Sequence, residues 1–167
     1  SLAANLYTNP GPIWVGLNGE RFADETNADS KLRSDAWTAA EENKVFIVYT
    51  DKAINPEMPM ITGAADANAA LAELIEAGEF VFKADTVEEL AQKAGINAEA
   101  LVKTIETYNA DCAAGKDSLF GREANLVAME EGPYYAIMTI PYVLITSGGP
   151  QINADAQMVN AAGEVIP

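Results

Sequence analysis

Residues 44–50, with the sequence KVFIVYT, restrict the fold more than any other stretch of the chain. β-Branched and aromatic side chains follow one another there without a polar interruption, which predicts a well-buried strand. A turn is expected at Asn18-Gly19, between two extended pieces of residues 12–25, because both positions tolerate positive φ. Further extended segments are predicted at 80–84 and within 133–146, and a hairpin is predicted to turn at residues 160–163.

Capping residues and apolar periodicity predict helices over residues 29–43, 66–78, 85–95 and 97–115. Asp29 or Ser30 caps the first helix, and Thr86 with Glu89 forms a capping box at the start of the third. The apolar face of the first helix is expected to comprise Leu32, Ala36, Ala39 and Ala40. Strands and helices neither alternate strictly nor separate into blocks, so the expected fold class is α+β.

The composition excludes several classes of function. The 167 residues carry a formal net charge of −15, which argues against a nucleic-acid or anionic-membrane surface. No apolar run approaches the roughly 18 residues of a membrane span, and the N-terminal residues lack the pattern of a secretory signal. The chain has no histidine and 1 cysteine, so a Ser-His-Asp triad is impossible within it and no metal site is expected.

Three polar residues leave two interpretations open. Arg33 and Arg122 are bidentate donors suited to the carboxylate of a ligand, although a structural ion pair is the commoner role of such arginines. Cys112 falls on the predicted apolar face of the last helix, which favours a buried structural thiol over a reactive one. The sequence also lacks G-x-G-x-x-G and G-x-x-x-x-G-K-[ST], so it contains no cradle for nucleotide phosphates.

Three phrases, taken in order, resemble one known family. Residues 13–25, IWVGLNGERFADE, resemble the pattern I-x-V-x-x-x-G-x-R-F-x-x-E. Residues 82–122 are similar to a helix pair that opens with ADT-x-EELA-x-x-G-I and ends with GKD-x-x-F-x-R. Residues 132–167 resemble a stretch that reads GPYYAI, then T-x-GG. The family is that of the FAD-dependent fumarate reductase and succinate dehydrogenase flavoproteins.

The resemblance implies a longer parent protein from which this chain is an excised middle. Residues 1–130 would form a capping, or substrate, domain, and residues 131–167 a β-segment leading back into the FAD-binding domain. The parent would be a FAD-dependent oxidoreductase that transfers hydride to or from a carbon–carbon double bond, with a capping-domain arginine as proton donor. Its partners would be the FAD-binding domain of the same parent and a small-molecule substrate. The isolated chain is expected to be inactive and to bind no FAD.

Individual family positions map onto this sequence. Glu25 matches the glutamate after R-F, and Arg33 matches an arginine that precedes an acidic residue, so both are predicted to be catalytic. The predicted cofactor-binding residues are Thr146, Ser147, Gly148 and Gly149. Leu144 and Ile145 stand where fumarate reductases have two histidines that bind substrate. They are predicted to line the substrate pocket, and fumarate is not the expected substrate.

Directly after the strand at 44–50, where the family carries its proton-donating arginine, Lys52 is the only cation and Ile54 lies near the expected place. Two alternatives from other classes remain open. The parent could be a non-catalytic acidic binding or capping module, or the chain could be a stand-alone acidic binding domain with a coincidental resemblance. Many relatives are exported bacterial proteins, but the compartment of this one is not indicated.

Overall fold

The computed structural model describes residues 3–4, 11–27, 29–53, 61–62, 64–140 and 149–166. Its centre is a four-stranded antiparallel sheet in the order β2-β3-β6-β5. These strands are β2 (Ile13–Val15), β3 (Val45–Thr50), β5 (Val81–Ala84) and β6 (Tyr134–Thr139). A separate antiparallel pair joins β1 (Ala3–Ala4) to β4 (Ile61–Thr62).

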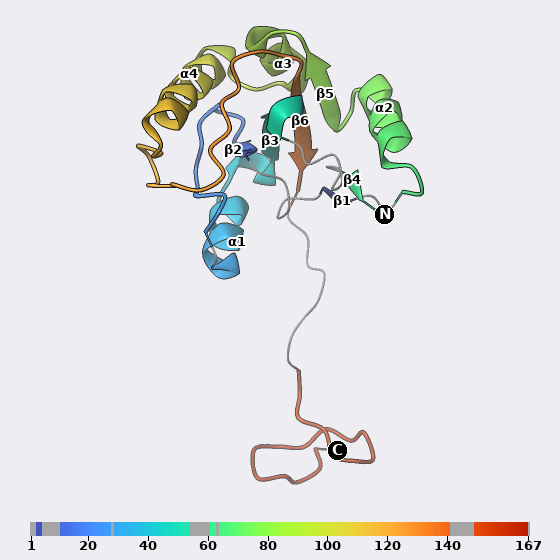
Figure 1. Ribbon diagram of the computed structural model, residues 1–167. Helices are drawn as coiled ribbons and strands as arrows, with labels where there is room; N and C mark the ends of the chain where they lie inside the picture. Colours follow the sequence, from blue (N-terminus) through green and yellow to red (C-terminus); the bar gives the residue numbers. More distant parts are fainter. Residues whose placement is uncertain are drawn as a thin grey trace.

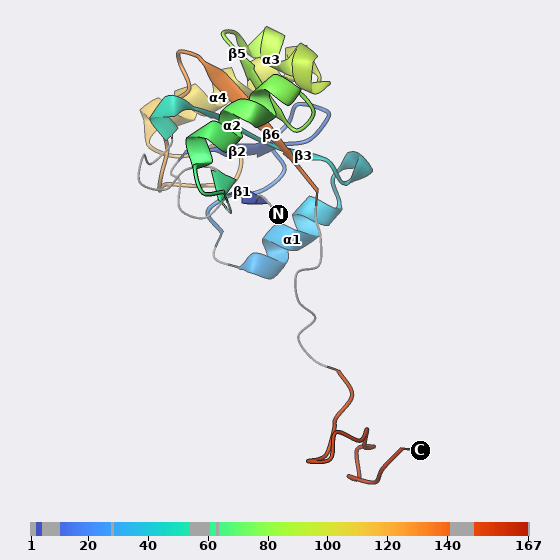
Figure 2. The same cartoon turned by 90° about the vertical axis from the view of Figure 1, so that its right-hand side faces the viewer.

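The helices of the described part are α1 (Ser30–Thr38), α2 (Ala67–Ala77), α3 (Val87–Ala94) and α4 (Ala98–Ala114), with 3-10 turns at Glu41–Asn43 and Asp51–Ala53. Figures 1 and 2 show α3 and α4 grouped together, with α1 and α2 at other positions around the sheet. Helices and an antiparallel sheet together confirm the expected α+β class. None of these helices is both long and apolar enough to cross a membrane.

Local signals place the helix ends. Asp29 Oδ1 accepts a hydrogen bond from Lys31 N at 2.8 Å, and Thr86 Oγ1 accepts one from Glu89 N at 3.2 Å. Glycines in the left-handed conformation close α2, α3 and α4, at Gly78, Gly95 and Gly115. The first helix is shorter than predicted, because Ala40 is extended and separates α1 from the 3-10 turn that follows.

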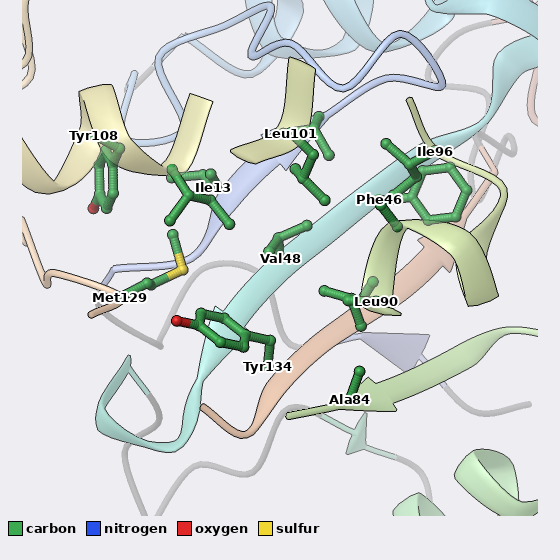
Figure 3. Close-up of a cluster of buried hydrophobic side chains, with 14 residues drawn as sticks. Ile13, Phe46, Val48, Ala84, Leu90, Ile96, Leu101, Tyr108, Met129 and Tyr134 are labelled. Carbon is green, nitrogen blue, oxygen red and sulfur yellow. The ribbon is translucent and has the colours of Figure 1, made fainter. Parts of the chain in front are cut away.

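The two faces of the sheet carry separate cores, because side chains alternate along each strand. Figure 3 shows the core that the sheet shares with α3 and α4, which includes Ile13, Phe46, Val48, Leu90, Leu101, Tyr108, Met129 and Tyr134. The opposite core, shared with α1 and α2, includes Trp14, Val45, Ile47, Tyr49, Tyr135, Ile137, Trp37 and Leu71. β3 is buried at all of its positions, which confirms the expectation for residues 44–50.

The prediction that Leu32 lies on the buried face of α1 is wrong. Leu32 is 55% exposed, whereas Ala36, Trp37 and Ala40 pack against the sheet. The ring of Trp37 lies 4.7 Å from that of Trp14 between centroids. The indole of Trp37 therefore determines which side of α1 faces the core, and it turns Leu32 outward.

β6 lies beyond the predicted boundary between residues 130 and 131, and that boundary stays a prediction. β6 lies inside the sheet, where it pairs with β3 on one side and with β5 on the other. The sheet therefore extends through Thr139, and a cut at residue 130 would remove one of its inner strands. The assignment of either part to a capping or a FAD-binding domain stays a prediction.

Residues 149–166 contain two consecutive turns of the same kind. Asn153 and Asn160 hold equivalent positions: the backbone carbonyl of each accepts the N–H three residues on, and its side-chain oxygen accepts the N–H four residues on. Isolated bridges join Ile152 to Met158 and Val159 to Val165. The second turn confirms the hairpin predicted at residues 160–163.

Candidate functional site

The loop from β2 to α1 begins at a turn that requires glycine. Gly19 has a φ of +79°, and a Cβ added there would lie 2.7 Å from the carbonyl oxygen of Asn97. Thr104 of α4 donates a hydrogen bond to the carbonyl oxygen of Gly19 at 2.8 Å. The sequence predicts an extended piece after this turn. In the structure this piece forms one isolated β-bridge, between Val15 and Arg21. The turn thus fixes the loop against α4 and directs Arg21 into the interior.

Four buried charged side chains meet behind this loop and form what we call the arginine–carboxylate network: Arg21, Glu25, Asp117 and Arg122. Arg21 Nη2 lies 2.8 Å from Glu25 Oε2 and 2.8 Å from Asp117 Oδ2. Arg122 Nη1 lies 3.1 Å from the same oxygen of Glu25. The two positive and two negative charges balance, which is the condition under which burial of ionised groups is tolerated.

Glu25 is saturated with donors. Its Oε1 accepts from Trp14 N at 3.0 Å and from Arg21 Nε at 2.9 Å, while Oε2 accepts from both arginines. Both oxygens of the carboxylate therefore bind groups of the protein itself. The structure shows Glu25 as a structural anchor that ties the loop to β2, and its predicted catalytic role stays a prediction.

Arg122 resolves one of the open alternatives in favour of a structural role. Besides Glu25, it donates to the carbonyl oxygens of Ala124 at 2.9 Å and Pro12 at 3.3 Å, and to that of Asn125. Its side chain is 1% exposed. The guanidinium thus joins two backbone segments, at Pro12 and at Ala124–Asn125, and has no surface on which to meet a ligand.

Two aromatic rings enclose Arg21. Its guanidinium carbon lies 5.2 Å from the ring centroid of Tyr108 and 5.2 Å from that of Phe120. Burial alone lowers the pKa of Arg21, but the hydrogen bonds to Glu25 and Asp117 outweigh burial and raise it. Burial raises the pKa of Asp117, but the hydrogen bond from Arg21 outweighs this and the net shift is downward. Both groups are therefore charged at neutral pH.

Tyr108 connects the network to Gly11, in the segment that leads into β2. Its hydroxyl donates to the carbonyl oxygen of Gly11 at 3.2 Å and accepts from Val127 N at 3.4 Å. Burial raises the pKa of Tyr108 to about 12, so the phenol is neutral under ordinary conditions. Tyr108 therefore has a structural role, in which its hydroxyl hydrogen-bonds to backbone groups of Gly11 and Val127, rather than a role as an acid or base.

A hollow of about 310 Å³ opens beside the network, and we call it the Arg33 hollow. It is lined by Phe22, Ala23, Asp24, Asn27, Leu32, Arg33, Ala36 and Phe120. Arg33 Nη1 donates to the carbonyl oxygen of Asn27, which ties the guanidinium to the loop that forms the opposite wall. Asp24 Oδ1 accepts from the backbone N and from Oγ1 of Thr26, at 2.8 and 2.7 Å. Most of the wall is apolar, with one cation and one engaged carboxylate.

The predicted site residues are placed unequally. Arg33 lines the hollow, and Glu25 lies in the network behind it. Gly149 begins the segment 149–166, whereas the other predicted cofactor and pocket residues fall outside the described residues: Leu144, Ile145, Thr146, Ser147 and Gly148. Lys52 is 61% exposed at its side chain, 4.0 Å from Glu131. Of the residues predicted to be catalytic, Arg33 alone lines the hollow.

Sequence reasoning missed Arg21, Asp117 and Phe120. Arg21 and Glu25 are four residues apart in a loop, so the i, i+4 rule for helices gives no signal that pairs them. Asp117 lies 96 residues from Arg21, and no local pattern indicates that contact.

Cys112 is half-buried, and burial raises the pKa of its thiol, in agreement with a structural role. In the described ranges, no group of Asp, Glu or Cys is placed to hold a metal ion.

Comparison with known proteins identifies the family. The model of the FAD binding domain family matches residues 4–167 of this chain. The chain belongs to this family. Its members are FAD-dependent flavoproteins, among which it resembles the fumarate reductases in particular. The family predicted from the three sequence phrases is thereby confirmed.

Relatives and solved structures of the flavoprotein family agree with one another. The chain is 32% identical to a probable fumarate reductase of Shewanella frigidimarina over 99% of its length, and 30% identical to a urocanate reductase of Eggerthella lenta over 98%. A structure of the open conformation of a flavocytochrome c3 fumarate reductase superposes with a TM-score of 0.68, 29% identity and coverage of 94% of this chain and 26% of that one. This chain spans about a quarter of the length of both relatives (26% of each).

The Arg33 hollow has the size of a small-molecule pocket. This flavoprotein chain has no glycine-rich cradle for a dinucleotide pyrophosphate. The Arg33 hollow, at about 310 Å³, lies at the lower end of the range of about 300–1,000 Å³ for ligand pockets. Apart from Gly149, the residues predicted to contact flavin lie outside the described ranges.

Proposed function

We propose that this chain is the capping domain of a FAD-dependent oxidoreductase that acts on a carbon–carbon double bond, with residues 149–166 leading into the FAD-binding domain of the same protein. The observation that carries the proposal is the family match over residues 4–167 together with an arginine-lined hollow at the loop that bears the R-F-x-x-E motif. Relatives named for fumarate and for urocanate reduction support the reaction class.

The substrate that we propose is less polar than fumarate. Fumarate carries two carboxylates, and each needs a cation or several donors once it leaves water. The Arg33 hollow supplies one guanidinium, and Asp24 on its wall would repel a second anion. Leu144 and Ile145, which stand where fumarate reductases have histidines, argue in the same direction.

In the proposed reaction, FAD supplies or accepts the hydride when it is bound. Arg33 would bind and orient a carboxylate or carbonyl of the substrate through its planar donors. The apolar wall would exclude water, which strengthens that electrostatic contact. The arginine–carboxylate network would hold the loop from Phe22 to Asn27 at a fixed distance from α1, so that the hollow keeps its shape.

The experiment uses the full-length protein, reduced anaerobically with dithionite. Flavin reoxidation is followed by absorbance after mixing with fumarate or with trans-cinnamate, which has one carboxylate and an apolar ring. We expect cinnamate to reoxidise the flavin faster than fumarate does. Rapid turnover of fumarate would overturn the proposed specificity.

The second candidate function is a non-catalytic acidic binding or capping module. The formal net charge of −15 and a saturated Glu25 favour it, because neither is a feature of a reactive centre. Failure of every enoate and enone to reoxidise the reduced full-length protein would support this candidate. In either case, residues 1–167 purified alone are expected to be colourless. A yellow preparation with stoichiometric FAD would contradict the proposal that the FAD site lies in another part of the full-length protein.

A further inference from the structure

Phe120 forms a wall of the Arg33 hollow, and its ring is held from behind by a buried cation. The guanidinium of Arg21 lies 5.2 Å from the Phe120 centroid, and it is itself fixed by Glu25 and Asp117 at 2.8 Å each. Phe120 is 37% exposed although it makes this contact. An aromatic ring held on a cation and open to a hollow presents a firm flat surface.

The turn that carries Phe120 is rigid for separate reasons. Asp117 N donates to the carbonyl oxygen of Arg122 at 2.8 Å, and Gly121 N donates to that of Asp117 at 3.0 Å. Asp117 Oδ1 also accepts from Leu119 N at 3.0 Å. Both ends of the turn are members of the arginine–carboxylate network. The position of Phe120 is therefore coupled to the buried arginine–carboxylate network.

The remaining walls set the chemistry of an occupant. Phe22 and Leu32 are apolar, Arg33 is cationic, and Asp24 already accepts two hydrogen bonds from Thr26. A flat apolar body fits against Phe120, and a single carboxylate fits Arg33. A second carboxylate would meet apolar side chains or Asp24 and would be desolvated without a partner.

We propose that Phe120 is a specificity-determining residue of the Arg33 hollow and that it selects a flat, apolar monocarboxylate over a dicarboxylate. The inference rests on the proposed function, because it treats the ligand of the hollow as the substrate of the full-length protein. Arg21 is a positioning residue in this scheme, since it acts through Phe120 and touches no ligand.

The test measures kcat and KM of the full-length protein with trans-cinnamate and with fumarate, for wild type, Phe120→Ala and Phe120→Leu. Phe80→Ala is the matched control, because Phe80 is 50% exposed and does not line the hollow. We expect Phe120→Ala to raise the KM for cinnamate about 3- to 10-fold and to change the KM for fumarate less, so that the preference for cinnamate narrows. Phe120→Leu, which keeps an apolar wall, should recover part of the loss.

Binding to the 167-residue chain, followed by ligand-observed NMR with the same two acids, separates failure of this inference from failure of the proposed function. Binding of cinnamate that depends on Phe120, without turnover in the full-length protein, would overturn the proposed function and leave the selectivity of the hollow intact. Turnover of cinnamate with an unchanged KM in Phe120→Ala would overturn the inference alone. Equal binding of fumarate and cinnamate to wild type would also overturn it.

Discussion

Arg122 and Arg33 are the same kind of residue in two contrasting settings. Arg122 is 1% exposed at its side chain and donates to Glu25 and to three backbone carbonyls. Arg33 is half-buried, ties to one carbonyl of the facing loop and lines a hollow. The buried network holds the loop in place, whereas we propose that the arginine at the hollow binds the substrate.

The largest effect on stability is expected for Arg122→Ala. Removal of one partner of a buried ion pair typically costs about 3–5 kcal/mol, because the opposite charge is left uncompensated. We expect a loss of this size in the free energy of unfolding, measured by urea denaturation and circular dichroism. A loss no greater than that of Arg33→Ala would break the comparison between the two arginines.

The variant Asp117→Asn tests the arginine–carboxylate network through the pH dependence of stability. The pKa of Asp117 is lowered in the folded chain, so its charge contributes stability above the unfolded pKa of about 3.9, and this contribution disappears as pH falls through the folded pKa. At neutral pH we expect the variant to lose about 1.5–3 kcal/mol. The difference from wild type should shrink below about pH 4. Denaturation curves at pH 7 and below pH 4 measure it, and a difference that grows on acidification would contradict the assignment.

A comparison of Gly19 with Gly95 tests how the loop between β2 and α1 is anchored to α4. Gly19 and Gly95 both have left-handed φ, but a Cβ at Gly19 meets backbone of α4, whereas nothing lies within 4 Å of one at Gly95. Gly19→Ala should therefore lose about 1–3 kcal/mol more than Gly95→Ala. The measurement is the midpoint of urea unfolding at a common slope. Equal losses would mean that only the backbone angle matters.

The smallest effect on stability is expected for Arg33→Ala, because Arg33 is half-buried and its hydrogen bond to the carbonyl oxygen of Asn27 contributes about 0.5–1.5 kcal/mol. In the full-length protein, however, kcat/KM with the preferred acid should fall by about 100-fold or more. Arg33→Lys keeps the charge without the planar fork and should recover only part of the activity. A large loss of stability together with unchanged kcat/KM would place Arg33 in the same class as Arg122.

The parts of the fold that sequence could predict are the local ones. Thr86, Gly95 and Gly115 determine helix ends through groups within a few residues, so their roles could be read from the sequence and are confirmed. Leu32 was misplaced because periodicity alone does not reveal that Trp37 would dominate the packing of α1.

The candidate site was harder to predict because it is assembled from distant segments. Arg33 was selected through a family pattern, and nothing in that pattern distinguishes a ligand-facing arginine from a structural one. The contacts of Arg122 with Glu25 and of Arg21 with Asp117 span 97 and 96 residues. Such pairs depend on the finished sheet and on α4, and local spacing carries no information about them.

The inner place of β6 also has a consequence for the order of events during synthesis. β3 and β5 leave the ribosome long before Tyr134–Thr139, yet within the sheet β5 pairs only with β6. Until β6 emerges, facing edges of β3 and β5 have no partner, and unpaired edges are sites of misassociation. A nascent chain that pauses before residue 134 would therefore hold a half-built sheet, and it is at this stage that protection by a chaperone would matter most.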